Sequence, residues 1–286
     1  MFASASPARN LARITAAAAA VLAVGAAAAT FGTSAASAST RAQAGTQNWI
    51  TTGWGIHLNN LADPATTSHF FNTAGSFGTG PNNSATPVSD GFATSGVLSY
   101  ASYAQFAADV RTGAITYPYK WVAYDPEAWS QTPLYEQRSP VKYLRLFGQL
   151  AHAHGYKVIE LPARDLGGVA GSACPALPGE SLDPWYIRCN IAGAAAAYAD
   201  IYVLQDQVNT TRVSEFAYLY NTARAQAQAA NPQIVTDTEV STNYGTPAQM
   251  AAAAQSVTAD GYYISATSPT LPQADQFLQQ MQAAGY

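Results

Sequence analysis

The stretch VKYLRLFGQLAHAHGYKVIEL, residues 141–161, decides the fold because it places a helix directly before a strand. Apolar residues in Val141–Ala153 recur with a period close to 3.6, which is typical of an amphipathic helix. Gly155 is typical of the residue that ends such a helix. The run Lys157–Leu161 is short, apolar and partly β-branched, as buried parallel strands are. This order indicates one unit of a parallel sheet with helical crossovers.

The same alternation continues along the chain and predicts an α/β fold, a (β/α)8-type (TIM) barrel. No glycine-rich nucleotide-binding pattern follows a strand, which disfavours a nucleotide-binding sheet. If the last strand is the eighth, only two strands are visible ahead of the fourth. A strand near Ala74–Gly78 would fill the gap; otherwise the first half of the barrel is irregular or incomplete. The predicted strands are Trp49–Leu58, Gly96–Tyr100, Tyr119–Tyr124, Lys157–Leu161, Ile201–Gln205, Ile234–Val240 and Gly261–Ala266, and the later helices are Val213–Ala230, Pro247–Thr258 (with Thr246 as its cap) and Pro272–Ala284.

Composition excludes two classes of protein. The chain has 286 residues, of which 48% are hydrophobic and 10% charged, and its formal charge is −4. Nucleic-acid binding needs Lys and Arg residues gathered in clusters, and the sequence has no such cluster. We therefore expect no nucleic-acid partner. The apolar content also argues against intrinsic disorder. We expect a monomer.

The first residues have the pattern of a secretory signal. Arg9 and Arg13 precede an apolar run, Ile14–Ala29, and the small residues Ala36–Ala38 fit a cleavage site. The alternative is a single-pass anchor. We therefore predict a signal peptide at residues 1–38, a flexible segment at 39–48 and a single barrel domain at 49–286. This predicts a secreted, extracellular protein with no membrane association after the signal is removed.

The chain has two cysteines, Cys174 and Cys189. An oxidising compartment would favour a disulfide that closes a short loop, and two buried free thiols are the alternative. The cysteine and histidine spacings do not fit a metal site, so we expect no cofactor and no metal. A carboxylate-only calcium site stays open.

Polar residues follow the predicted strands, and in a barrel the carboxyl ends of the strands carry function. Asp, Glu, Gln, Tyr and Trp side chains around one rim suit a carbohydrate, as substrate or ligand, because its hydroxyls need planar hydrogen-bonding groups and its C–H faces pack on aromatic rings. The candidate substrate-binding residues are Trp129, Tyr124, Glu160, Arg164, Asp165, Gln205, Gln207, Asp237, His57 and Tyr263.

Three carboxylates are the candidate catalytic residues. Glu127 is the candidate general acid, and a close carboxylate such as Asp125 would raise its pKa. Glu239, on the predicted seventh strand, is the other candidate partner, because glycoside hydrolysis usually needs two carboxyl groups. Alternatively, Glu127 is a surface carboxylate at the start of a helix, where its charge interacts favourably with the helix dipole. The alternative for Asp237 and Glu239 is a polar rim or a buried hydrogen-bonded pair.

The segment Tyr124–Trp129 resembles the end of the fourth-strand motif of family 18 glycoside hydrolases, the chitinase-like barrels, and Leu161–Ala163 resembles the ending of their next strand. The resemblance implies that Glu127 is the acid and that Asp125 orients an acetamido group, which itself attacks. The chain departs from the family at Lys120 and Ala123, where the family has Asp, and at Leu204–Gln207. In its Ala-rich leader and composition the chain also resembles secreted actinobacterial proteins.

The strand positions also fit a second resemblance: Glu127 after the fourth strand and Glu239 on the seventh resemble the acid and nucleophile of retaining barrel glycosidases. Those enzymes have Asn before the acid, where this chain has Pro126. The expected function is therefore a secreted glycoside hydrolase. A carbohydrate-binding barrel without catalysis is the alternative. An esterase is the weakest reading, because the chain has no G-x-S-x-G motif.

Overall fold

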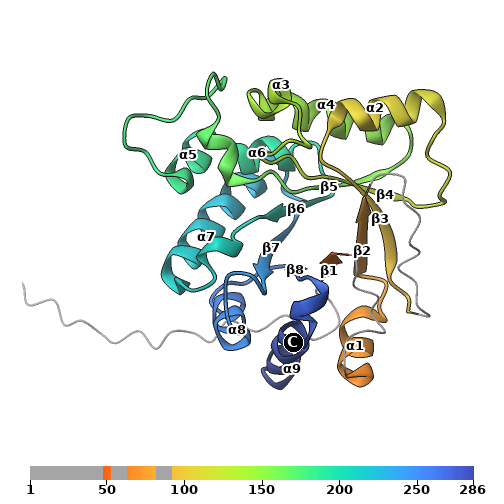
Figure 1. Ribbon diagram of the computed structural model, residues 1–286, viewed down its shortest axis with the longest axis vertical. Helices are drawn as coiled ribbons and strands as arrows, with labels where there is room; N and C mark the ends of the chain where they lie inside the picture. Colours follow the sequence, from red (N-terminus) through yellow and green to blue (C-terminus); the bar gives the residue numbers. More distant parts are fainter. Residues whose placement is uncertain (1–47, 53–62, 82–91) are drawn as a thin grey trace, which may run out of the picture. The chain divides into compact units, whose positions relative to one another are not determined.

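The computed structural model describes residues 48–52, 63–81 and 92–286, all of which belong to the compact unit Thr40–Tyr286. The predicted signal peptide at 1–38, nearly all of the predicted flexible segment at 39–48, and His57 lie outside the described residues. Figure 1 shows the strands at the centre of this unit with the helices around them.

Eight parallel strands form a closed barrel in sequence order, with β1 paired to β8. The (β/α)8 fold is confirmed. Of the two alternatives for the first half of the barrel, the strand near Ala74–Gly78 is confirmed, as β2, and the irregular or incomplete first half is not. The strands are β1 (Asn48–Thr52), β2 (Ser76–Pro81), β3 (Ser95–Tyr100), β4 (Trp121–Tyr124), β5 (Lys157–Glu160), β6 (Ile201–Leu204), β7 (Val235–Ser241) and β8 (Gly261–Ser265).

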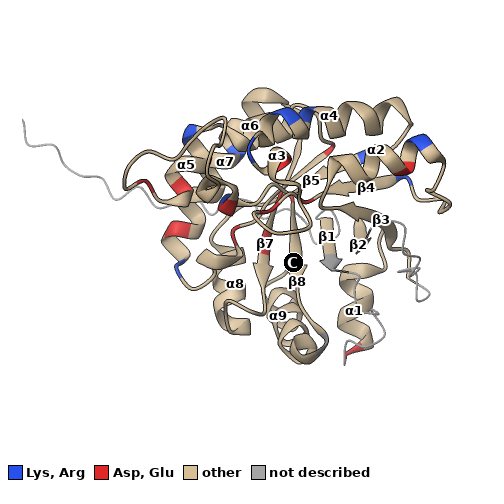
Figure 2. Ribbon diagram, turned by 45° about the horizontal axis from the view of Figure 1, so that its top comes forward, with Lys and Arg blue, Asp and Glu red and all other residues tan. Residues whose placement is uncertain are grey.

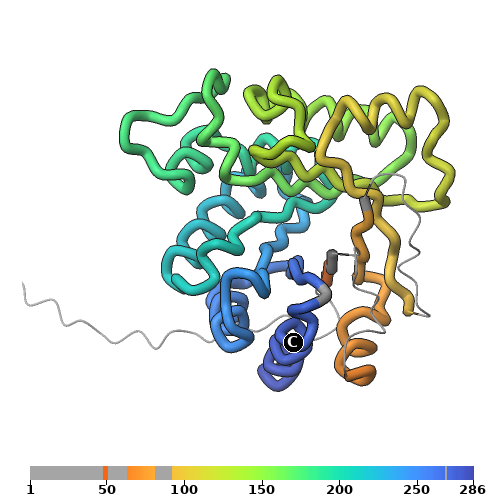
Figure 3. Tube along the Cα trace, in the orientation of Figure 1, coloured from red at the N-terminus to blue at the C-terminus, as the bar shows by residue number. Residues whose placement is uncertain are grey.

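Helices follow the strands around the ring, and Figure 3 lets the reader trace this path by colour from β2 to α9. The helices are α1 (Pro64–Phe71), α2 (Tyr103–Thr112), α3 (Leu134–Gln137), α4 (Pro140–Ala153), α5 (Leu182–Arg188), α6 (Ile191–Ala196), α7 (Val213–Ala230), α8 (Pro247–Gln255) and α9 (Leu271–Ala283), with short 3-10 turns η2 (Arg164–Gly168), η3 (Gln207–Asn209) and η4 (Ser268–Thr270). In the described part of the chain, no helix has both the length and the apolarity to cross a bilayer.

The predicted helix ends are confirmed where the sequence signals are strongest. The Thr246 hydroxyl accepts from the Gln249 backbone N–H, and the Gln249 side chain accepts from the Thr246 N–H, which is a complete capping box. Gly155, just after α4, has a φ of +78°, a left-handed conformation that glycine adopts without steric cost. These residues fix where α8 begins and where α4 ends.

Side chains alternate between two apolar layers because successive residues of a strand face opposite sides. A small cluster, which includes Ile50, Ala123 and Ile159, fills the barrel interior. A larger cluster lies between the strands and the helices. There the Tyr124 ring of β4 stacks on Phe147 of α4, with ring centroids 4.7 Å apart and planes 9° apart. This alternation decides which polar residues reach the barrel axis.

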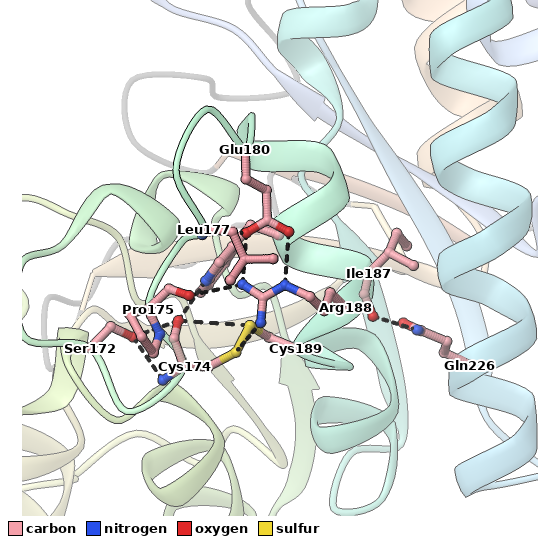
Figure 4. Close-up of a disulfide and its surroundings, with 10 residues drawn as sticks. Ser172, Cys174, Pro175, Leu177, Glu180, Ile187, Arg188, Cys189 and Gln226 are labelled. Atoms are coloured by element: carbon pink, nitrogen blue, oxygen red, sulfur yellow. Dashed lines mark hydrogen bonds and ion pairs between the residues drawn. A yellow bond between two sulfur atoms is a disulfide. The ribbon is translucent and has the colours of Figure 1, made fainter. Parts of the chain in front are cut away.

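The predicted disulfide is confirmed, and free thiols are excluded, because Cys174 and Cys189 are bonded to each other. Figure 4 shows how the surrounding loop is fixed to α5. Arg188 donates to Glu180 Oε2 at 2.7 Å and to the Pro175 carbonyl at 2.8 Å. The disulfide therefore anchors the connection between β5 and α5, which reaches the carboxyl end of the barrel.

Candidate active site

The interior rows of β4 and β7 carry acidic residues to the carboxyl end of the barrel. Trp121 and Ala123 contribute to the interior cluster, and Asp125 follows them with the same alternation. On β7, Val235 lies in that cluster and Glu239 continues its row. Figure 2 shows several acidic positions close to the centre of the ring of strands and basic positions on the surrounding helices and loops.

A primary amide at the end of β6 connects β4 to β5. The Gln205 side chain is 5% exposed. Its Nε2 donates to Asp125 Oδ1 at 2.5 Å and to the Leu161 carbonyl oxygen at 2.7 Å. The predicted residues Asp125 and Gln205 therefore meet, although they are 80 positions apart.

Burial raises the pKa of all three candidate catalytic carboxyls, and repulsion by neighbouring carboxyl groups raises it further. Burial is the largest cause for Glu127, and the Asp165 carboxylate adds to it, so that the pKa of Glu127 rises to about 7. Burial, followed by the charge of Glu127, raises the pKa of Asp125 well above its ordinary value. Burial, followed by Asp125 and Glu127, does the same for the pKa of Glu239. The three groups are thus close enough to influence one another's ionisation.

A phenol from β8 completes the group. Tyr263 is 8% exposed, and its hydroxyl lies 3.3 Å from Thr79 Oγ1 on β2. Burial raises the pKa of Tyr263, and the carboxyls of Glu239 and Asp125 raise it further. The phenol therefore stays protonated and can donate a hydrogen bond beside the carboxyls.

The segment after β4 forms the edge of the site. Asp165 Oδ1, from η2, accepts from the Ala128 N–H at 3.0 Å, so the two loops are joined next to Glu127. Trp129 is 37% exposed, and its indole Nε1 donates to Thr132 Oγ1 at 3.0 Å. The predicted residue Trp129 thus lies two positions after Glu127 along the chain, and the predicted residue Asp165 contacts the backbone next to Glu127.

Three of the predicted substrate-binding residues, Tyr124, Glu160 and Arg164, point away from this group. Tyr124 and Glu160 face the helix layer, and the Tyr124 hydroxyl donates to Glu136 Oε2 at 2.8 Å. Glu160 is fully buried and, within the described structure, has no hydrogen-bond partner at either carboxyl oxygen; burial raises its pKa well above the ordinary value. Arg164 forms an ion pair with Asp183. For Tyr124 and Glu160 the physical reason is strand parity, because the strand neighbours of interior residues point outward. Arg164 lies after the strand, in η2, where no strand parity applies.

The remaining predicted residues lie elsewhere. Asp237 is in the barrel interior, one layer below Glu239, where a side chain on Gly261 would contact its Oδ1. Burial raises the pKa of Asp237 well above the ordinary value. Gln207 belongs to η3, outside the strand. Asp237 and Gln207 therefore do not join Asp125, Glu127 and Glu239.

Some residues that organise the site carry no sequence signal of their own. Thr132 and Asp183 lie in loop or helix positions with no strand periodicity to place them. Asp206 adjoins Gln205 but faces Arg164, whose Nη1 lies 3.8 Å from Asp206 Oδ1. Burial raises the pKa of Asp206 to about 8. No three His, Cys, Asp or Glu side chains among the described residues form a group able to hold a metal ion.

Comparisons with known proteins correct the family that the sequence suggests. No family model matches the chain, and no curated protein matches it. Among solved structures, the chain is similar to hydroxymethylglutaryl-CoA lyase from Pseudomonas aeruginosa, with 14% identity and a TM-score of 0.47 over 78% of this chain and 77% of that one.

The expected assignment to family 18 glycoside hydrolases is corrected: no family model matches the chain, and the solved structure to which it is similar is a lyase. The expected glycoside hydrolase activity, with its alternative of a carbohydrate-binding barrel without catalysis, is corrected with it. At this level of similarity no substrate or reaction passes from the lyase to this chain. The chemistry of the site must therefore come from its own residues.

Proposed function

We propose that this chain is an enzyme whose reaction includes a proton transfer at the carboxyl groups of Asp125 and Glu127, with Glu239 facing them. The convergence of these three groups from β4 and β7 supports the proposal, because carboxyls that repel one another in a buried site retain protons at neutral pH. Glu127 is the group that exchanges its proton, since a pKa of about 7 leaves both forms populated near neutral pH.

The remaining groups orient the ligand. Gln205 fixes Asp125 through its amide, and the Tyr263 phenol supplies a donor. Asp125 and Glu239 also act as O–H donors while they are protonated. A ligand with hydroxyl or carbonyl oxygens would satisfy these donors.

Charge narrows the ligand class further. Within the described structure, neither Lys nor Arg forms an ion pair with Asp125, Glu127 or Glu239. An anionic ligand would meet the negative charge of ionised Glu127, which no Lys or Arg of the described residues pairs with. We therefore propose an uncharged polar substrate rich in oxygen. A carbohydrate, expected from the sequence, is one member of this class and stays a prediction.

A product screen tests the proposal. The wild-type protein is incubated with uncharged hydroxyl- and carbonyl-bearing compounds, and new products are sought by mass spectrometry. Glu127→Gln should lower the rate of product formation by about 100-fold or more, because a positioned acid or base contributes roughly that factor.

The matched control is Glu215→Gln, which changes an exposed carboxylate in the first turn of α7. This control should retain the wild-type rate. Equal rates for wild type and Glu127→Gln would contradict the proposal. Binding of a compound without any conversion would also contradict it, since the site would then be a binding site only.

A further inference from the structure

One buried hydroxyl lies at the junction between Glu127 and Trp129. Thr132 is 1% exposed and sits between β4 and α3. Its Oγ1 accepts from the Glu127 backbone N–H at 3.2 Å and from the Trp129 indole Nε1 at 3.0 Å. The same hydroxyl donates to the Ala101 carbonyl oxygen at 2.8 Å, which connects the turn to the end of β3.

This arrangement uses the full capacity of a hydroxyl, which has one donor and two acceptor positions. A second side chain holds the same turn: Gln137 Nε2 donates to the carbonyl oxygens of Trp129 and Thr132, at 2.7 Å in each case. The chain from Glu127 to Thr132 therefore has its shape fixed by two buried side chains.

The consequence concerns Trp129, which is 37% exposed although its indole N–H and its carbonyl are both bonded. An exposed ring held in place loses little conformational freedom when a ligand packs on it. Large aromatic rings also supply much of the contact energy in binding sites. A fixed, exposed indole two residues from Glu127 is thus a preformed contact surface.

We propose that Thr132 is a positioning residue that holds the Trp129 ring and the Glu127 backbone in one geometry, so that the ring receives an apolar or planar face of the substrate beside the proton-exchanging carboxyl. This inference rests on the proposed function. It adds to the ligand class: the oxygen-rich, uncharged substrate also presents a flat or C–H-rich face.

Three variants test it. Thr132→Val keeps the size of the side chain and removes the hydroxyl, whereas Thr132→Ser keeps the hydroxyl. Trp129→Phe keeps a ring and removes the indole N–H. The first measurement is the exchange rate of the Trp129 indole N–H with solvent, followed by NMR. In Thr132→Val the indole N–H should exchange about 5- to 10-fold faster, because it has lost one hydrogen bond. In Thr132→Ser it should exchange at the wild-type rate.

The second measurement is the kinetics on the substrate that the screen finds. Trp129→Phe should raise KM about 5- to 10-fold with kcat nearly unchanged, because the smaller ring offers less contact area and is no longer held by Thr132, while the proton transfer is untouched. Thr132→Val should lower kcat as well, since it also releases the Glu127 backbone, and Thr132→Ser should restore it. A Thr132→Val protein that does not fold leaves the Trp129→Phe result to decide.

The two proposals fail separately. An unchanged indole exchange rate in Thr132→Val would overturn the positioning role of Thr132, whatever the activity. An unchanged KM in Trp129→Phe would overturn the contact role of the ring. Faster indole exchange together with full turnover by Glu127→Gln would instead refute the proton-transfer function and leave the positioning of Trp129 intact.

Discussion

Glu127 shows how surroundings tune one side chain. Burial disfavours the charged form and is the largest cause of its raised pKa, Asp165 adds repulsion, and Gln205 opposes both by hydrogen bonding to the ionised form. The opposing contributions leave the pKa of Glu127 at about 7. A carboxyl balanced in this way can give and take a proton near neutral pH.

Two substitutions should move this pKa in opposite directions. Asp165→Asn removes a repelling charge and keeps an oxygen that accepts from Ala128, so the pKa of Glu127 should fall below 7. Gln205→Leu removes the hydrogen bond that lowers the pKa of Glu127, so the pKa of Glu127 should rise. The limb of the kcat/KM profile that reports Glu127 should move to lower pH in the first variant and to higher pH in the second. A limb that stays in place in both would contradict these causes.

At this scale the sequence predicted part of the site. Asp125 and Glu239 could be placed because strand alternation carries a row of interior residues to the strand end. The same rule excludes Tyr124, since it is adjacent to Asp125 and must face the other side. Thr132 could not be predicted, because its role depends on the path of a loop and not on any periodic pattern.

The elements around the site are joined by buried hydrogen bonds. Glu136 of α3 is 1% exposed and accepts from the backbone N–H groups of Tyr103 at 2.8 Å and Ala104 at 3.0 Å. A carboxylate at this end of α2 stabilises the helix through its free N–H groups and its dipole. The Tyr124 hydroxyl donates to the same carboxylate, so α2, α3 and β4 are held together through Glu136.

Close packing between α4 and the chain after α6 gives a prediction for stability. A side chain on Gly148 would overlap the Tyr198 carbonyl, whereas nothing lies within 4 Å of the same position on Gly168. Gly148→Ala should therefore lower the free energy of unfolding by about 1–3 kcal/mol. Gly168→Ala, the matched control, should change it by less than about 0.5 kcal/mol. Urea denaturation measures both, and equal stability of the two variants would contradict this packing.

The predicted elements are confirmed where their patterns are strong and local. The later strands and the helices α4 and α7 have long apolar repeats, and all were predicted. Strand β2 has the sequence SFGTGP, in which Phe77 is the one large apolar residue, so its pattern is weak. Its place is fixed by pairing with β1 and β3 and by the contact of Phe77 with Trp121, whose ring centroids are 4.8 Å apart.

For the whole molecule, the buried acids predict how stability depends on pH. Their folded-state pKa values lie above the ordinary ones, reaching about 7 for Glu127 and about 8 for Asp206. Between the ordinary and the raised pKa, the unfolded chain ionises more readily than the folded one. The contribution of these groups to the free energy of unfolding is therefore fully present below about pH 4 and is lost as the pH rises towards 8.

Glu180 acts in the opposite direction, because its hydrogen bond with Arg188 lowers its pKa to about 2, and its contribution is lost only in acid. We therefore expect the free energy of unfolding, from urea denaturation with the disulfide intact, to be larger near pH 5 than near pH 8. A larger value near pH 8 would show that the buried carboxyls are ionised in the folded protein.

The sequence also predicts export, which stays a prediction. The Cys174–Cys189 disulfide agrees with an oxidising compartment. Closure of the barrel by the pairing of β1 with β8 could be inferred only by counting strands, since no local pattern records a contact between the two ends of the fold.

The central claim is that the carboxyl end of this barrel holds an acid that exchanges its proton near neutral pH. NMR titration of the side-chain carboxyl carbons tests it most directly. We predict a Glu127 signal that titrates near 7 in the wild type and in Glu215→Gln, and that is absent from Glu127→Gln. A Glu127 signal that titrates near its ordinary value, about 4.3, would contradict the account.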